Sequence, residues 1–135
     1  MVTTPITKKR ILYSDFGKNM DLHPVSNDVS RKTNEEAIKE SIRNLILTNR
    51  GERLFQPYVG CDITQMLFEN VEPETIERIK EATQETIETY ESRCKLIGVD
   101  VFANYDSNSV RVVIVFLVIN STEPTTLEII LDRVR

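Results

Sequence analysis

The chain has 135 residues, of which 40% are hydrophobic and 28% are charged, and its formal net charge is −4. This is the composition of an ordinary globular protein, long enough for one domain with a hydrophobic core. The acidic balance argues against a nucleic-acid scaffold, because phosphate binding favours an excess of lysine and arginine. The apolar run at residues 112–119 is too short to cross a bilayer, so no membrane partner is expected.

The first residues and the cysteines favour a product of the cytoplasm. No apolar run resembling a signal peptide follows Met1. Cys61 and Cys94 are expected to be reduced thiols, although the sequence leaves a disulfide between them open. The sequence contains neither a zinc motif nor a phosphate-cradling glycine loop, so no metal, cofactor or small-molecule substrate is expected.

Residues 1–32 lack helical or strand periodicity for most of their length and are expected to form an extended N-terminal arm before a single domain at residues 33–135. A floppy tail is the alternative, but such tails seldom carry many large apolar residues. The composition therefore favours an arm that lies on its own sheet or on a neighbouring molecule. The apolar residues of this arm are Leu12, Tyr13, Phe16, Leu22 and Val25. His23 is the only histidine and is not expected to bind a metal.

The first element of the domain is predicted to be an amphipathic helix. Thr33 and Glu36 fit a capping box, with Thr33 as the N-cap. Apolar residues then recur at three- and four-residue spacing, which predicts one buried stripe. The stripe consists of Ile38, Ile42, Leu45 and Ile46. The helix should end near residues 48–51, with Gly51 in a left-handed C′ position and Arg50 at the negative end of the dipole.

Residues 50–63 form a loop that combines two glycines and a proline with several apolar side chains. A loop this apolar is expected to pack against something. A short helical segment at residues 64–69 should follow, and then a second long helix that begins at Pro73, a favoured first-turn residue. Its predicted inward face consists of Ile76, Ile79, Thr83, Ile87 and Tyr90.

Three runs rich in β-branched residues, at 96–103, 110–119 and 126–131, predict a meander of three antiparallel strands. The middle run is apolar on both faces, and Arg111 is its only charge. A solvated face normally shows polar residues at alternate positions, so this strand should be covered on both sides. Helices can cover one face, and the arm or another protein can cover the other. The predicted fold class is α+β, a three-stranded antiparallel β-meander packed against two main helices.

Three segments in order resemble the signature of one small family. They are residues 48–53 (TNRGER), 57–62 (PYVGCD) and 67–69 (LFE). Together with the order helix, loop, helix and three strands, they resemble the baseplate wedge proteins of contractile-tailed phages, whose relatives initiate the sheath in type VI secretion baseplates. The family also has a Glu-Pro-Arg signature at the end of the long helix. Glu91-Ser92-Arg93 matches it with serine in place of proline, which loosens the backbone at this corner.

The resemblance implies a structural role in the tail baseplate of a virion that is assembled in the host cytoplasm. It implies that Glu91, Ser92 and Arg93 dock on the helical core bundle formed by other wedge proteins. The adjoining loop is expected to help join the wedge, through Arg50, Gly51, Arg53, Pro57 and Gly60. From the residues alone, Arg93 could instead cap the last carbonyls of the helix.

The resemblance also implies that the sheet initiates the tail sheath by adding strands from the first ring of sheath subunits. An edge strand offers unpaired N–H and C=O groups, and an added strand satisfies them. Residues 96–104 and 126–132 are the two candidate edges. The preferred pairing residues are Thr126, Leu127, Glu128, Ile129, Ile130 and Leu131.

A peptidoglycan-degrading, lysozyme-like glycoside hydrolase is the alternative function, because some members of the resembled family carry a lysozyme label. Glycoside hydrolysis needs two carboxylates about 5–10 Å apart in a cleft. Glu52, Asp62 and Glu69 lie in or near the loop, but nothing selects a pair among 21 acidic residues. No spacing supports Ser-His-Asp or Cys-His chemistry either. We therefore expect a structural protein without enzymatic activity.

Overall fold

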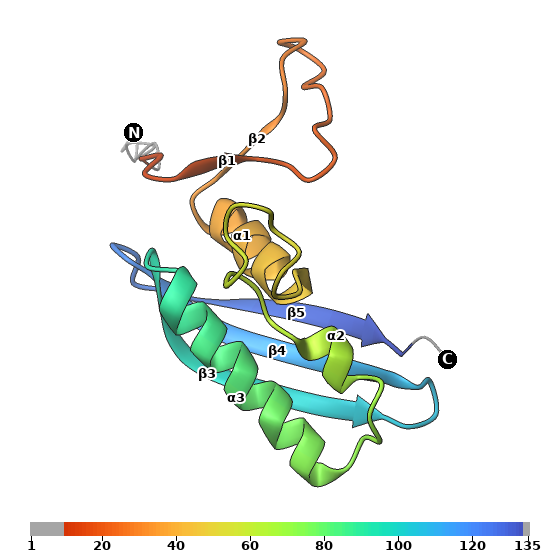
Figure 1. Ribbon diagram of the computed structural model, residues 1–135. Coiled ribbons are helices and arrows are strands. Elements are labelled where there is room, and N and C mark those ends of the chain that lie inside the picture. The colour runs from red at the N-terminus through yellow and green to blue at the C-terminus, as the bar shows by residue number, and fades with distance from the viewer. Residues whose placement is uncertain (1–9, 134–135) are drawn as a thin grey trace.

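The computed structural model describes residues 10–133 and confirms the α+β fold, a three-stranded antiparallel sheet with helices on one face (Figure 1). The sheet consists of β3 (Cys94–Asn104), β4 (Ser109–Val118) and β5 (Pro124–Asp132). The helices are α1 (Glu35–Leu47), the short α2 (Ile63–Met66) and α3 (Pro73–Tyr90). Two short strands, β1 (Ser14–Phe16) and β2 (Arg31–Thr33), form a separate hairpin before α1.

The predicted meander is confirmed, with strand order β3-β4-β5 and every pair antiparallel. Both connections are turns in which an asparagine adopts a positive φ, Asn108 at 53° and Asn120 at 70°. Asparagine tolerates this left-handed conformation better than most residues. Because β4 lies in the middle, β3 and β5 are both edge strands of the sheet that residues 10–133 form.

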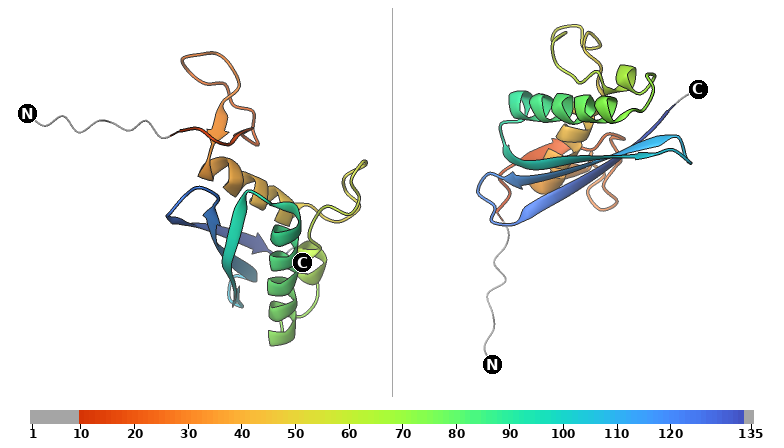
Figure 2. Two further views of the ribbon diagram at one scale, coloured as in Figure 1. Left: turned by 90° about the vertical axis from the view of Figure 1, so that its left-hand side faces the viewer. Right: turned by 90° about the horizontal axis from the view of Figure 1, so that it is seen from below.

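One face of the sheet forms the hydrophobic core with α1 and α3. The alternate residues of β4 on this face are all buried, namely Val110, Val112, Ile114, Phe116 and Val118. The three isoleucines of the predicted α1 stripe and isoleucines of α3 pack against them. Figure 2 shows α3 running along this face of the sheet. Burial of each such side chain stabilises the fold by about 1.5–3 kcal/mol.

The predicted inward face of α3 is buried at Ile79, Thr83 and Ile87. The Thr83 hydroxyl donates to the Ile79 carbonyl at 2.7 Å, which satisfies a polar group inside the core. Tyr90, at the end of the helix, is partly exposed and donates its hydroxyl to the carbonyl of Tyr58 at 2.7 Å. This bond ties the end of α3 to the loop that follows α1.

The other face of the sheet is open in the part of the chain that the structure describes. Val113, Val115 and Leu117 of β4 are only half-buried on this face. Phe102 and Ile130, opposite Arg111 in the neighbouring strands, are more than half exposed. The expected cover by the arm is therefore not made by the described arm residues, and cover by another protein stays a prediction.

The described part of the arm, from Arg10 onward, forms the β1–β2 hairpin, which projects beyond α1 (Figure 1). An isolated bridge between Leu22 and Val29 continues this pairing toward the tip. The predicted apolar residues are mostly exposed, and Tyr13 is the one that packs against the core. The first nine residues of the predicted arm lie outside the described range.

The predicted capping box of α1 is wrong. Thr33 belongs to β2 and pairs with Ser14, so the N-cap is Asn34, with φ 51° and ψ −119°. The Asn34 amide does not cap the helix. Its Oδ1 accepts the N–H of Leu12 at 2.8 Å, and its Nδ2 donates to the Arg10 carbonyl at 3.1 Å. A contact between residues distant in sequence replaces the local capping pattern.

The predicted role of Gly51 at the helix end is also wrong. The helix ends at Leu47, and its C-cap is Thr48, in an extended conformation. Gly51 does have a positive φ of 85°, but it lies further along, inside the loop. The glycine therefore predicted the positive φ correctly, but this φ belongs to the loop and not to the end of the helix.

Candidate functional site

The corner between α3 and β3 contains the sequence Glu91-Ser92-Arg93. Glu91 is the C-cap of α3, its N–H donates to the Ile87 carbonyl at 2.9 Å, and only 4% of the residue is exposed. Arg93 forms two parallel hydrogen bonds with this buried carboxylate. Its Nε donates to Oε1 at 2.7 Å, and its Nη2 donates to Oε2 at 2.8 Å. Such a bidentate pair is both strong and geometrically specific.

Electrostatics keeps the Glu91–Arg93 pair ionised. Burial alone pushes the pKa of Glu91 upward, but hydrogen bonds from Arg93 and Ser41 and the Arg93 charge outweigh it, so this pKa lies below its ordinary value. The hydrogen bond to Glu91 raises the pKa of Arg93 in turn. The pair is therefore charged at neutral pH.

The arm completes this corner. The Arg93 guanidinium carbon lies 5.9 Å from the centre of the Tyr13 ring, within the range of a cation–π contact. The Tyr13 N–H is bonded to Asn34 Oδ1 at 3.3 Å, which fixes the tyrosine beside the start of α1. Ser92 is exposed and the Arg93 side chain is 29% exposed, so these two residues present the corner to solvent. No local pattern reveals Tyr13 and Asn34, because both act on residues distant in sequence.

The loop after α1 has a backbone frame built by its signature residues. The Cys61 N–H donates to the Thr48 carbonyl at 2.8 Å and closes the base of the loop. Gly60 has φ 139°, and a Cβ there would lie 2.5 Å from the Thr48 carbonyl oxygen. Only glycine fits this position without a backbone shift. Farther from the base of the loop, the Gly51 N–H donates to the Pro57 carbonyl at 2.7 Å.

Two carboxylates complete the frame of this loop. Glu52 accepts the backbone N–H of Asn49 at 2.9 Å. Asp62 accepts the backbone N–H of Arg50 at 3.2 Å, and its other oxygen lies 3.7 Å from Nε of the same arginine. Glu52 and Asp62 are thus engaged in holding the shape of the loop.

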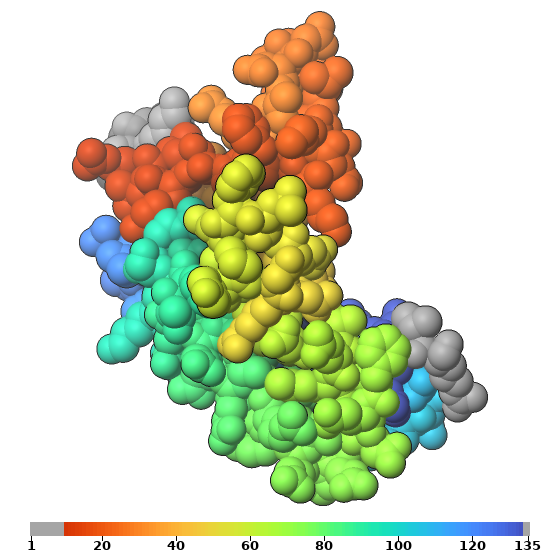
Figure 3. Space-filling model, viewed as in Figure 1, coloured from red at the N-terminus to blue at the C-terminus, as the bar shows by residue number. Residues whose placement is uncertain are grey.

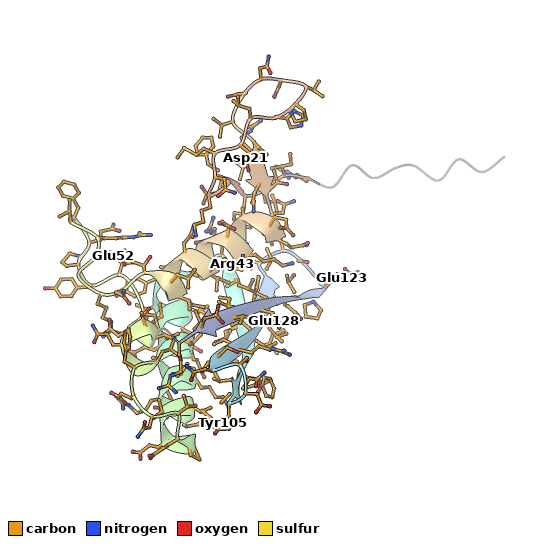
Figure 4. The ribbon with its side chains drawn as sticks, turned by 90° about the vertical axis from the view of Figure 1, so that its right-hand side faces the viewer. Asp21, Arg43, Glu52, Tyr105, Glu123 and Glu128 are labelled. Carbon is orange, nitrogen blue, oxygen red and sulfur yellow. The ribbon has the colours of Figure 1, made fainter. Side chains whose placement is uncertain are left out.

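Three large apolar side chains of the loop are exposed to solvent, whereas Val59 is half-buried. Leu54, Phe55 and Tyr58 are 92%, 97% and 81% exposed. Figure 4, in which Glu52 marks the loop, shows the loop projecting from the body. In the space-filling view the same segment, in yellow, lies at the front between the arm and the green helices (Figure 3). For these three side chains, the expected packing partner is therefore not found among residues 10–133.

The third candidate surface is the outer edge of β5. Leu127, Ile129 and Leu131 point into the core, whereas Glu128 and Ile130 lie on the open face. Glu128 pairs with Arg111 of β4 at 3.1 Å. In the described part of the chain, β5 pairs only with β4, so its other edge is free of strand pairing.

The carboxylates proposed for glycoside hydrolysis all have structural partners. Glu52 and Asp62 hold the loop backbone, and Glu69 pairs with Arg78 at 2.9 Å. The shallow hollow lined by residues 52–56 contains one carboxylate, that of Glu52. A glycosidase site needs two facing carboxylates.

Both cysteines are free thiols. Burial raises the pKa of Cys61, and it raises the pKa of Cys94 to about 11. Such thiols are weakly reactive at neutral pH. Among residues 10–133, no cluster of three potential ligands could hold a metal ion, and no described helix has the length and apolar character to span a membrane.

Comparisons with known proteins give a consistent family. A model of the family described as baseplate wedge protein gp25 matches residues 32–123. Baseplate wedge protein gp25 of Enterobacteria phage T4 is 35% identical over 112 residues, which are 83% of this chain and 84% of that protein.

Solved structures share the fold. A Geobacter sulfurreducens chain, provisionally described as a tail lysozyme, has a TM-score of 0.68 and 26% identity over 75% of this chain and 92% of its own. A chain of the anti-feeding prophage baseplate has a TM-score of 0.63 and 20% identity, with 91% and 87% covered. A chain of the type VI secretion baseplate complex has a TM-score of 0.55 and 14% identity, with 68% and 88% covered. At such identities the last two support the fold alone.

Proposed function

Because the chain belongs to the baseplate wedge protein gp25 family, we propose that it docks on the helical core bundle of a baseplate wedge and initiates tail-sheath polymerisation by strand addition. Family membership makes it a structural tail component of the wedge. The observation that carries the proposal is the family match over residues 32–123, which include both long helices, the corner and most of the sheet.

The corner is the proposed docking point on the core bundle. Glu91 holds the Arg93 guanidinium in one orientation, while Ser92 and the exposed part of Arg93 remain free to meet a partner. A guanidinium fixed in this way loses little entropy when it binds. The loop residues Arg50, Gly51, Arg53, Pro57 and Gly60 adjoin this corner through the bond between Tyr90 and Tyr58.

The docking role is tested with Ser92→Trp, which adds a bulky ring at an exposed position and leaves the buried pair intact. We expect loss of binding to the purified remaining wedge proteins, measured by sedimentation. Ser107→Trp, in the exposed turn at the opposite end of β3, is the matched control and should bind normally. Normal binding by Ser92→Trp would exclude the corner as the docking point.

The β5 edge is the proposed template for the sheath. Thr126 to Leu131 can pair with a strand of a sheath subunit, because their outer edge is not paired within residues 10–133. Glu128 and Asp132 discourage promiscuous pairing at such an edge. Wedges reconstituted with this protein should nucleate sheath polymerisation, whereas wedges that lack it should not. Equal polymerisation rates with and without the protein would contradict the proposed initiation.

A muralytic enzyme is the second candidate, because one relative of similar fold is provisionally described as a tail lysozyme. The structural partners of Glu52, Asp62 and Glu69 favour a non-enzymatic protein. Purified protein should therefore fail to clear a peptidoglycan suspension. Clearing that is abolished by Glu52→Gln would reverse this assignment.

A further inference from the structure

Three large apolar side chains lie close together in the sequence of the loop after α1. Leu54, Phe55 and Tyr58 lie within five residues of one another, and each is more than four-fifths exposed. Single exposed hydrophobic residues are common and need no explanation, whereas a cluster of them indicates an interaction site. We call these three residues the apolar tip.

The backbone holds the apolar tip in one conformation. The hydrogen bond from Gly51 to Pro57 closes the segment that carries Leu54 and Phe55. Within that segment, the Gln56 N–H donates to the Arg53 carbonyl at 3.3 Å. A preorganised loop gives up little conformational entropy on binding, so its exposed side chains suit an anchor.

The residues of the loop therefore divide into a frame and a tip. The polar groups of Arg50, Glu52 and Asp62 form bonds within the loop. Glycine is required at position 60 because the backbone there lies close to Thr48. None of these residues needs to touch a partner in order to matter. The residues that the frame displays are the ones available for contact.

We propose that the apolar tip inserts into an apolar pocket with an acidic rim on another protein of the baseplate wedge. Phe55 and Tyr58 are the aromatic anchors, since aromatic side chains dominate the binding energy of protein interfaces. The acidic rim follows from Arg53, which is exposed and forms no ion pair within residues 10–133. The inference rests on the proposed wedge function but concerns a contact distinct from the Glu91–Arg93 corner.

A protein partner fits the surroundings of the tip better than a lipid surface does. The Tyr58 carbonyl accepts the hydroxyl of Tyr90, the residue next to Glu91, so the tip adjoins the proposed docking corner. A partner on that corner is within reach of the loop. The chain carries a net charge of −4, which disfavours approach to an anionic bilayer, and stable membrane anchoring usually needs two signals.

The direct test places a photoreactive benzoyl-phenylalanine at position 55 in assembled baseplates. We expect an adduct with one baseplate protein, mapped by mass spectrometry to an apolar pocket flanked by aspartate or glutamate. The same probe at Phe68, another exposed phenylalanine, is the matched control and should not give that adduct. Absence of a protein adduct at position 55, or an adduct on a basic surface, would overturn the proposal.

Affinity measurements separate the tip from the corner. We expect Leu54→Ser/Phe55→Ser to weaken binding to the purified remaining wedge proteins at least about tenfold, and Arg53→Glu about threefold. Phe68→Ser should bind within about twofold of wild type. Thermal unfolding should be unchanged in the tip variants, because these side chains are exposed.

The Ser92→Trp variant makes the two failures distinguishable. Normal binding by the tip variants with weak binding by Ser92→Trp overturns the tip proposal and leaves the docking corner in place. The reverse result supports the tip and removes the corner. Binding of wild type, but not of the double serine variant, to vesicles of phosphatidylethanolamine and phosphatidylglycerol would replace the protein partner with a membrane.

Discussion

The two faces of β4 consist of similar apolar residues but differ in how deeply these residues are buried. On one face, Val112, Ile114 and Phe116 are fully buried under α1 and α3. On the other, Val113, Val115 and Leu117 are only half-buried, and no described helix covers them. An apolar pattern predicts that a face is to be covered, but it does not say whether the cover comes from the same chain. In this molecule, one face builds the core, and the other is left open within residues 10–133.

The largest contrast between the faces is expected at two neighbouring residues. Phe116→Ala should lower the free energy of unfolding by about 3–5 kcal/mol, because it removes a fully buried ring and leaves a cavity. Leu117→Ala, on the open face, should lower it by about 1 kcal/mol or less. Urea denaturation measures both values. Equal losses would mean that the open face is packed within the chain.

The buried Glu91–Arg93 pair should show an asymmetric response. Arg93→Ala leaves a buried carboxylate unpaired and should lower the free energy of unfolding by about 3 kcal/mol. Glu91→Gln leaves a partly exposed guanidinium that water can reach, so its loss should be smaller, about 1–2 kcal/mol. Chemical denaturation at pH 7 measures the difference, and a larger loss for Glu91→Gln would contradict the burial argument.

The same pair predicts a dependence on pH. The pKa of Glu91 is lower in the folded state than its ordinary value, so its contribution is complete above the unfolded pKa. The contribution is lost as the pH falls through the folded pKa. The stability gap between wild type and Glu91→Gln should therefore shrink on acidification, as followed by denaturation from pH 7 downward. A gap that widens would contradict the assigned charge state.

A smaller difference in stability is expected between two glycine-to-alanine substitutions, one in the loop and one in the sheet. Gly60→Ala should destabilise the protein by about 1–3 kcal/mol, because φ is positive and the added Cβ meets the Thr48 carbonyl. Gly98→Ala, in β3 opposite Val115 of the open face, has free space around the added carbon and should be neutral or slightly stabilising. Thermal denaturation compares them. A destabilised Gly98→Ala would mean that this position needs glycine for a reason other than space.

The smallest effect is expected from the ion pair on the open face. Arg111 and Glu128 are about half exposed, so Arg111→Ala should change the free energy of unfolding by at most about 1 kcal/mol, and less in high salt. Denaturation at low and high ionic strength measures this. A loss as large as that of Arg93→Ala would show that the open face is not solvated.

The sequence predicted the elements with strong periodicity and missed those held by distant contacts. The strands follow from runs of β-branched residues between polar turns, and the two long helices follow from apolar residues at three- and four-residue spacing. The β1–β2 hairpin and the Asn34 bonds join segments about twenty residues apart, and no local pattern encodes them. The predicted capping box is wrong for this reason, because Thr33, in β2, pairs with Ser14 and does not cap α1.

The candidate site stays a prediction, and the sequence indicated only part of its geometry. The resemblance pointed to Glu91, Ser92 and Arg93 and to the loop, and the structure brings these two regions together through Tyr90 and Tyr58. That Glu91 is engaged by Arg93 depends on burial at the helix end, which spacing alone does not reveal. The sequence also did not reveal that Leu54 and Phe55 are exposed, because a loop with so many apolar side chains was expected to be packed.

Hydrogen exchange on reconstituted wedges, with and without sheath subunits, tests most directly whether the sheet is a template for other chains. The account predicts that the amides of β5 whose N–H groups face its free edge gain strong protection when sheath subunits are added, while those of α3 stay unchanged. Sheath binding that leaves every β5 amide as exposed as before would contradict it.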